Sequence, residues 1–213
     1  MSVQVVVQHV TRYRYDRPIA LGAQTVRLRP APHCRTKILA YGLTISPKDH
    51  FLNWQQDPQS NWLARVLVPE KTDHLTVRVD LTAELDVINP FDFFLEPDTE
   101  RFPFAYAPEL KAELEPYLRK QNCGPRFAAY AKTIARDIQP TTGFLFDINA
   151  KLSREIAYLI RLEPGIQTPD ETLARRSGSC RDTSWLLVQL LRELGLAARF
   201  ASGYLIQLKQ DVK

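Results

Sequence analysis

The chain has 213 residues, a hydrophobic fraction of 45%, a charged fraction of 24% and a formal net charge of +4. This is the composition of an ordinary globular protein, long enough for one large domain or two small ones. The basic residues are scattered, with Arg175 and Arg176 as the one notable pair, so we expect no nucleic-acid partner. No stretch approaches the roughly eighteen apolar residues of a membrane span, and we expect no membrane association.

Cysteine usage and the N-terminal sequence indicate a reducing compartment. The three cysteines, Cys34, Cys123 and Cys180, are few, odd in number and far apart, unlike those of a disulfide scaffold. The residues after Met1 lack the basic start, apolar run and small-residue cleavage site of a secretory signal. We therefore expect a cytoplasmic location.

Residues 1–88 are predicted to form an antiparallel β-sandwich. The clearest strand covers residues 74–85, where apolar and polar side chains alternate and thereby separate a core face from a solvent face. Turn sequences rich in Pro, Asp and Ser separate it from the shorter candidates 3–15, 24–28, 38–46 and 61–68. Short strands with such regular turn signals are typical of a small sandwich.

Residues 89–108 are predicted to be a strap between two domains. Four prolines prevent a regular element, yet the segment is too aromatic for a free linker. Its rings are Phe91, Phe93, Phe94, Phe102, Phe104 and Tyr106. We expect these rings to pin the strap to the second domain; an exposed, ligand-binding aromatic patch is the alternative.

Residues 109–213 are predicted to form a helical second domain. Its expected helices are an apolar segment at 109–118 that Pro116 bends or shortens, a helix from Pro125 with apolar residues up to Ile138, and a helix capped by Asp147 with apolar residues up to Leu159. A capping box at 168–171 predicts a further short helix that ends near Arg176. After the last helix, residues 197–208 have the composition of a strand.

The candidate nucleophile is Cys180. Apolar residues at helical spacing follow it and stop at Gly195, which places the cysteine in the first turn of a buried helix. Unpaired N–H groups and the positive end of the helix dipole would then favour a thiolate, the reactive form of cysteine. The plain alternative is a small buried cysteine that only packs.

The residues around Cys180 are candidates for supporting the nucleophile. They are Gly178, Ser179, Arg181, Asp182 and Trp185. A carboxylate in a first helical turn is usually favourable to the dipole, so we expect a structural role for Asp182, which can anchor the loop through Arg181 or backbone donors.

Other chemistries have little support in the sequence. All four histidines, at positions 9, 33, 50 and 74, lie in the predicted sandwich, where we expect surface or strand roles. The sequence has no C-x-x-C, no histidines at metal-ligand spacing, no phosphate-binding glycine loop and no G-x-S-x-G elbow. We therefore expect neither a metal nor a cofactor.

The chain resembles bacterial transglutaminase-like proteins over nearly its whole length. The nucleophile segment of that family is similar to residues 178–182 (Gly-Ser-Cys-Arg-Asp), 194–199 (Leu-Gly-Leu-Ala-Ala-Arg) and 202–204 (Ser-Gly-Tyr). Further similar stretches are 54–58 (Trp-Gln-Gln-Asp-Pro), 89–94 (Asn-Pro-Phe-Asp-Phe-Phe) and 163–169 (Glu-Pro-Gly-Ile-Gln-Thr-Pro). The implied fold class is α+β: the sandwich at 1–88, the strap at 89–108 and the first half of a papain-like core at 109–213.

The resemblance implies a Cys-His-Asp triad that holds the acyl group of an amide as a thioester on Cys180. In the family, the histidine and aspartate lie on strands after the Gly-Tyr strand, and here only the cysteine matches. We therefore expect an N-terminal fragment that is inactive alone and acts, when complete, on a protein or peptide by transfer, deamidation or proteolysis. An apolar strand at 197–208 without sheet neighbours would favour self-association.

Two other functions stay open. The sandwich can serve a non-catalytic module that binds a protein or peptide, with the cysteine domain as a degenerate scaffold. A redox-sensing lone thiol is the third possibility, although no resolving cysteine lies near Cys180 in the sequence.

Overall fold

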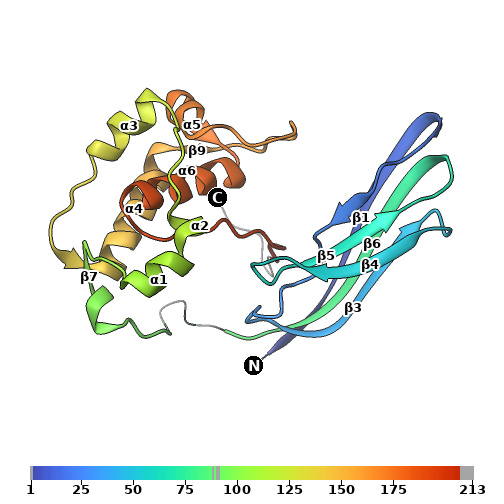
Figure 1. Ribbon diagram of the computed structural model, residues 1–213, viewed down its shortest axis with the longest axis horizontal. Helices are drawn as coiled ribbons and strands as arrows, with labels where there is room; N and C mark the ends of the chain where they lie inside the picture. Colours follow the sequence, from blue (N-terminus) through green and yellow to red (C-terminus); the bar gives the residue numbers. More distant parts are fainter. Residues whose placement is uncertain (1, 88, 90–91, 207–213) are drawn as a thin grey trace. The chain divides into compact units, whose positions relative to one another are not determined.

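The computed structural model in Figure 1 describes residues 2–87, 89 and 92–206. The chain divides into two compact units, Met1–Asp92 and Phe93–Lys213. The first contains the β-strands of two sheets and the second contains the helices, so the chain has the predicted α+β class.

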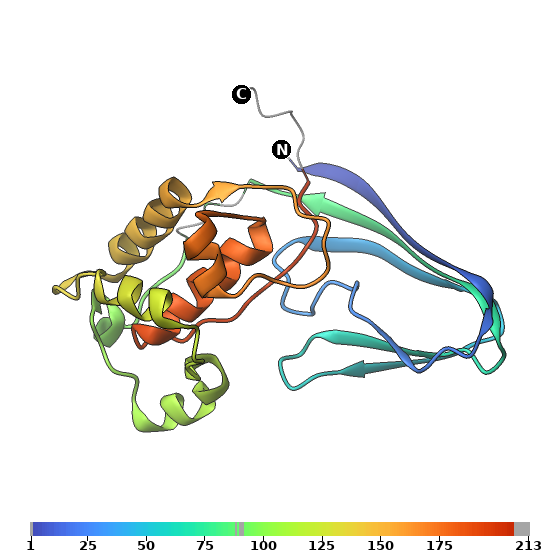
Figure 2. The ribbon, with the colours of Figure 1, turned by 90° about the horizontal axis from the view of Figure 1, so that it is seen from above.

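Two antiparallel three-stranded sheets form the N-terminal unit, in the orders β1-β6-β3 and β2-β5-β4. Figure 2 shows them as separate layers. The strands are β1 (Val3–Ile19), β2 (Gln24–Val26), β3 (Lys37–Ser46), β4 (Phe51–Gln56), β5 (Trp62–Leu67) and β6 (Thr72–Leu85). The sequence did not predict β4, whose Asn and Gln residues mask the alternation, but its partner β5 supplies the pairing from Phe51 to Gln56.

The central strand β6 carries the predicted alternation into the core. Leu75, Val77, Val79, Leu81 and Ala83 are all buried, while the residues between them are more exposed. Leu75 and Val77 pack with side chains of both sheets in one cluster, whose other buried members are Ile45 and Val66. Full burial of one such side chain stabilises the fold by about 1.5–3 kcal/mol, so this cluster holds the two layers together.

Helix α6 (Cys180–Glu193) lies in the middle of the C-terminal unit (Figures 1 and 2). The other helices are α1 (Pro108–Glu113), α2 (Glu115–Leu118), α3 (Pro125–Lys132), α4 (Thr141–Glu155) and α5 (Pro169–Arg175). Short elements precede or join them: η1 (Pro97–Thr99) and β7 (Arg101–Phe102) before α1, then β8 (Gln139–Pro140), β9 (Ala157–Tyr158) and β10 (Ser177–Gly178) between helices. Leu186 and Leu190 of α6 are fully buried in a core shared with β7, α3 and α4.

The strap is pinned by some of its rings and not by others. Phe102 is 1% exposed and stacks on Phe144 of α4, with ring centroids 3.7 Å apart. Phe104 packs against the same core, and the Tyr106 hydroxyl accepts a hydrogen bond from the backbone N–H of residue 197. Phe94, in contrast, is fully exposed, and Phe93 is 44% exposed, so the prediction was wrong for both rings. Phe91 lies outside the described residues.

Helix boundaries differ from prediction in two places. Helix α4 begins at Thr141, not at Asp147, because Phe144 extends the apolar stripe of Ile148 one turn towards the N-terminus. Asp147 therefore lies exposed in mid-helix and caps nothing. Helix α3 ends at Lys132, so Ile138 lies beyond it and is 72% exposed. Leu159, beyond the end of α4, is likewise 47% exposed.

The bent first helix, the capping box and the glycine stop are as predicted. Helices α1 and α2 meet at Leu114, shortly before Pro116. Thr168 and Glu171 form the capping box of α5, and Gly195 has a φ of +88° just after α6.

The predicted strand at 197–208 does not form within the described residues 197–206. Strands need backbone partners, and here Ala198 N–H donates to the carbonyl of Tyr117 in α2, while the Ala198 carbonyl accepts from Arg192. The start of the segment therefore packs on helices; residues 207 and 208 lie outside the described part. None of the described helices has the length and apolar character needed to cross a membrane.

Candidate active site

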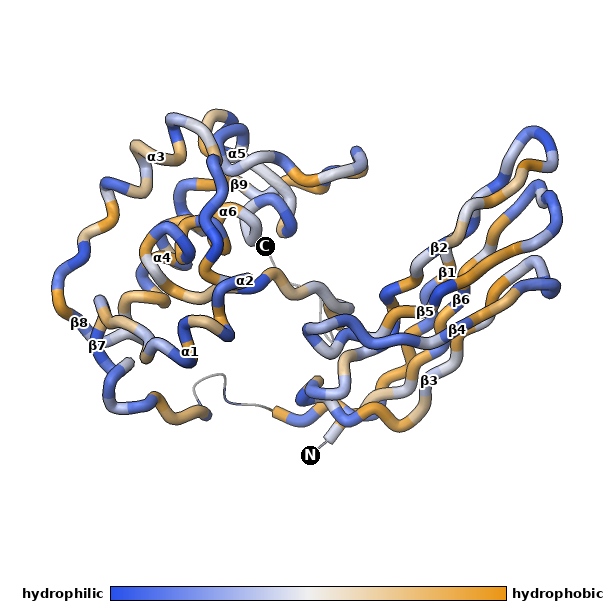
Figure 3. The backbone as a smooth tube through the Cα atoms, in the orientation of Figure 1, coloured by the Kyte–Doolittle hydropathy of each residue, from blue (hydrophilic) through white to orange (hydrophobic). Residues whose placement is uncertain are grey.

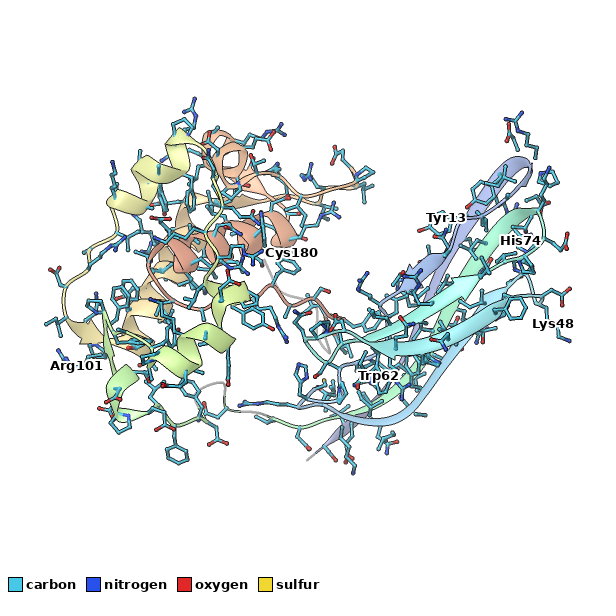
Figure 4. The ribbon with its side chains drawn as sticks, in the orientation of Figure 1. Tyr13, Lys48, Trp62, His74, Arg101 and Cys180 are labelled. Carbon is cyan, nitrogen blue, oxygen red and sulfur yellow. The ribbon has the colours of Figure 1, made fainter. Side chains whose placement is uncertain are left out.

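Cys180 is the first residue of α6, and its thiol is exposed (Figure 4). The preceding Ser179 is the N-cap, with an extended backbone. Two turns further on, the same helix is completely buried at Leu186. The helix is thus anchored along its length in the core, while its N-terminal residue presents the sulfur to solvent. This agrees with the predicted position of Cys180, and in the described part of the chain the cysteine is exposed and not packed in the core.

The carboxylate of Asp182 organises the turn that carries Cys180. Asp182 is fully buried, and its Oδ1 accepts a hydrogen bond from Gln167 N at 2.8 Å. Its Oδ2 accepts from Ser179 N at 2.8 Å, from Ser179 Oγ at 2.7 Å and from Arg161 Nε at 2.9 Å. The structural role predicted for Asp182 matches this geometry: one side chain joins the N-cap, the 159–167 loop and the helix.

Hydrogen bonds keep this buried carboxylate ionised. Burial by itself would raise the pKa of Asp182, because it penalises the charged form. The donors from Gln167, Ser179 and Arg161 outweigh that effect and lower the pKa of Asp182 to about 2. Asp182 therefore carries a full negative charge near neutral pH.

Two arginines connect the start of α6 with the 159–167 loop, one from each side. Arg161, and not the predicted Arg181, is the cation beside Asp182. Arg181 donates through Nη2 to the carbonyls of Glu163 (2.7 Å) and Arg161 (3.4 Å). Arg161 in turn donates through Nη2 to Gly165 O at 3.3 Å. Sequence reasoning missed Arg161 because its partner lies 21 residues away, and no local pattern signals the pair.

Gly178 allows the chain to approach Asp182 closely. It is buried in β10, a short strand of Ser177 and Gly178 that pairs in parallel with β9. A Cβ at position 178 would lie 2.9 Å from Asp182 Cβ and 3.2 Å from Gln167 Oε1. A side chain has no room here. Trp185, also singled out from the sequence, lies half-buried on α6 one turn after Asp182.

The loop between β9 and α5 projects from the unit (Figure 1), and the hydropathy colouring in Figure 3 shows apolar residues along it. Ile160 is 80% exposed and Leu162 90% exposed. The charged residue between them, Arg161, has a side chain that is only 16% exposed, because it turns back to Asp182. The loop is therefore held at its arginine, not by burial of its apolar residues.

No histidine accompanies Cys180 within its own unit. All four histidines belong to the N-terminal unit, and the sequence from 93 to 213 contains none. His74 lies in β6, as expected of a strand residue, and contacts Asp73 and Ser46. His50 lies between β3 and β4 and contacts Pro47 O. In the described part of the chain, no three His, Cys, Asp or Glu residues form a group that could hold a metal ion.

The other two cysteines lie in different settings. Cys34 is exposed in the N-terminal unit. Cys123 is partly buried, and its Sγ lies 3.8 Å from Gln189 Oε1 on α6. Burial, with smaller contributions from Glu193 and Asp170, raises the pKa of the Cys123 thiol, so it is a poorer nucleophile near neutral pH.

Comparison with known proteins identifies both units. The bacterial transglutaminase-like N-terminal region matches residues 5–84, and the transglutaminase-like superfamily core matches residues 128–212. Uncharacterized proteins of Mycobacterium bovis and Mycobacterium tuberculosis are 25% identical over 203 residues, which cover 93% of this chain. The chain spans 65% of the length of these curated relatives.

A solved structure shares the fold. The crystal structure described as that of a "Putative Cysteine Protease" from Cytophaga hutchinsonii has a TM-score of 0.62 and 15% sequence identity. The likeness covers 92% of this chain and 66% of that protein, and at this identity it concerns the fold alone. The two family matches identify residues 5–84 as a bacterial transglutaminase-like N-terminal region and residues 128–212 as part of the transglutaminase-like superfamily.

Proposed function

We propose that this chain is part of a transglutaminase-like cysteine enzyme in which Cys180 attacks the carbonyl of an amide in a protein or peptide. The observation that carries the proposal is the exposed Cys180 thiol on the first residue of a buried helix, next to the anchored Asp182. The match of the transglutaminase-like superfamily to residues 128–212 includes this position.

The first step forms a bond between Cys180 Sγ and the amide carbon, and breaks the C–N bond as the amine leaves with a proton. The resulting thioester is then attacked by water or by a second amine, which restores the thiol. Negative charge develops on the carbonyl oxygen before the C–N bond breaks. The backbone N–H of Cys180 is our candidate donor to that oxygen, since the first N–H groups of a helix have no intrahelical acceptor.

The reaction needs a base to take the thiol proton and return it to the leaving amine. Residues 93–213 contain no histidine, whereas the family resemblance requires a histidine and an aspartate for the triad. We propose that sequence corresponding to the remaining third of the mycobacterial relatives supplies both groups, so that the 213-residue chain alone is inactive. Exposed, unpaired thiols at Cys34 and Cys180 suit a reducing compartment, and we propose a cytoplasmic location.

The second candidate is a non-catalytic module that binds a protein or peptide. The lack of a histidine in the C-terminal unit favours it, because a degenerate enzyme would keep the scaffold without its base. Incubation of the full-length native protein with an activated acyl donor, followed by peptide-level mass spectrometry, separates the two. An acyl adduct on Cys180 that forms and turns over supports the enzyme, whereas no adduct on Cys180 supports the binding module.

A further inference from the structure

The turn that carries Cys180 contains a buried ion pair whose two charges come from different segments. Asp182 is fully buried, and the Arg161 side chain that pairs with it is 16% exposed. The Asp182 carboxylate accepts a hydrogen bond from the backbone N–H of Ser179, which directly precedes Cys180. The negative charge of Asp182 therefore lies within one helical turn of the Cys180 sulfur. Any net charge at this pair therefore acts on the thiol.

We propose that Arg161 is a positioning and charge-balancing residue for Cys180: it locks the Asp182 carboxylate that fixes the nucleophile turn and cancels the negative charge that would otherwise oppose the thiolate. This rests on the proposed function in treating the thiolate of Cys180 as the reacting form. The two charges have separate effects, because Asp182 sets the geometry of Ser179 and Cys180 while Arg161 sets the net charge.

Coulomb's law gives the direction of these effects. An unbalanced carboxylate within a turn of the sulfur destabilises a second negative charge by an amount that grows as the surroundings become less polar. A guanidinium 2.9 Å from the carboxylate removes most of that repulsion. The site is partly shielded from solvent, so salt screens the pair less than it would on an open surface.

The neighbouring charged groups do not replace Arg161. Glu163 lies 3.7 Å from Arg161 Nη1 and is 71% exposed, and Arg181 on α6 is occupied by loop carbonyls. On α5, Glu171 accepts from Thr168 within the capping box and interacts electrostatically with both Arg175 and Arg161. Removal of Arg161 would therefore leave Asp182 with neutral donors, namely the Ser179 and Gln167 groups.

The path of the loop supports a dedicated role for Arg161. Its neighbours Ile160 and Leu162 are 80% and 90% exposed and add little burial energy. The segment is held instead by polar contacts, from Arg161 to Asp182 and to Gly165 O and from Arg181 to Glu163 O. A loop that only had to close the gap between β9 and α5 would not need an arginine directed at the nucleophile turn.

The test measures iodoacetamide alkylation of Cys180 as a function of pH, by peptide-level mass spectrometry on this chain. Arg161→Gln is expected to raise the midpoint pH of the alkylation rate by roughly one pH unit, and Asp182→Asn to lower it, as a single unbalanced charge requires. The double variant Arg161→Gln/Asp182→Asn is expected to have a midpoint pH close to that of the wild type. Arg161→Lys keeps the positive charge and is expected to hold the wild-type midpoint.

Arg154→Gln on α4 is the matched control, because it removes one exposed positive charge from the same unit, whereas the ion pair of Asp182 is with Arg161. The proposal is overturned if Arg161→Gln leaves the midpoint unchanged, or if Arg161→Lys and Arg154→Gln shift it as far as Arg161→Gln does. If Asp182→Asn fails to fold, the alkylation midpoints of Arg161→Gln, Arg161→Lys and Arg154→Gln still test the proposal. The alkylation test needs no substrate, so it is independent of the test of the proposed function. If Cys180 formed no acyl adduct in the full-length protein, the proposed function would fail, but the alkylation midpoints of the arginine variants would still test the role of Arg161.

Discussion

Arg161 Nε lies 2.9 Å from Asp182 Oδ2, although 21 residues separate the two along the chain. The contact joins an otherwise exposed loop to the first turn of α6. Through Ser179 N it also reaches the residue before Cys180, so the position of the nucleophile depends on a long-range ion pair and not on the helix alone.

The stability of the C-terminal unit should fall in acid because of Asp182. Folding lowers the pKa of this carboxyl from its ordinary value of 3.8 to about 2. A lowered folded-state pKa stabilises the fold above pH 3.8, and the contribution, about 2 kcal/mol, is lost as the pH falls towards 2. Urea unfolding followed by circular dichroism should show the deficit of Asp182→Asn at pH 7 shrinking between pH 4 and pH 2.

Phe102 should be the aromatic residue on which the strap depends. It is 1% exposed and stacked on Phe144, so Phe102→Ala should destabilise the unit by about 3–5 kcal/mol. Phe94 is fully exposed, and Phe94→Ala should stay within about 0.5 kcal/mol of wild type. Denaturant midpoints of the two variants compare them directly; equal losses would contradict the assignment of Phe102 to the core.

Gly178 should tolerate no side chain. The added Cβ of Gly178→Ala would meet Asp182 Cβ at 2.9 Å, and we expect a loss of about 1–3 kcal/mol together with slower alkylation of Cys180. Gly143→Ala is the control. Gly143 lies in helix α4, and a Cβ at this position would meet no atom within 4 Å. That variant should gain about 0.5–1 kcal/mol in thermal unfolding. If Gly178→Ala left the free energy of unfolding unchanged, the turn would be able to relax around a side chain, contrary to the prediction.

We propose that the apolar segment after α6 promotes self-association of this chain. Leu205 is 85% exposed, and residues 197–206 form no strand that would cover it. Leu205→Lys should therefore reduce the mass measured by light scattering after size-exclusion chromatography, whereas Ser202→Lys on the same segment should not. A monomeric wild-type chain at high protein concentration would refute the proposal.

Local sequence patterns predicted the elements whose signals are local. Alternation in β6, the capping box at Thr168 and the glycine stop at Gly195 each depend on neighbours within a few residues, and all three are present. Cys180 was placed correctly for the same reason, since the apolar period of α6 starts just after it.

What the sequence did not reveal depends on distant partners. Strand β4 exists because β5 pairs with it, and the Arg161–Asp182 contact exists because a loop folds back. Residues 197–206 have strand composition but form no strand, and the start of the segment bonds to helix and strap groups instead. Composition gives a preference, and a strand also needs a neighbour. The start of α4 was placed too late because Asp147 is a good capping residue that lies in mid-helix.

The most direct test of the account is the acylation of Cys180 in the full-length native protein. After incubation with an activated acyl donor, peptide-level mass spectrometry should find one acyl group on Cys180 and none on Cys123, and Cys180→Ser should abolish turnover. Cys180 is not the nucleophile if the protein turns the donor over with Cys180 replaced, or if Cys180 stays unmodified while Cys34 reacts.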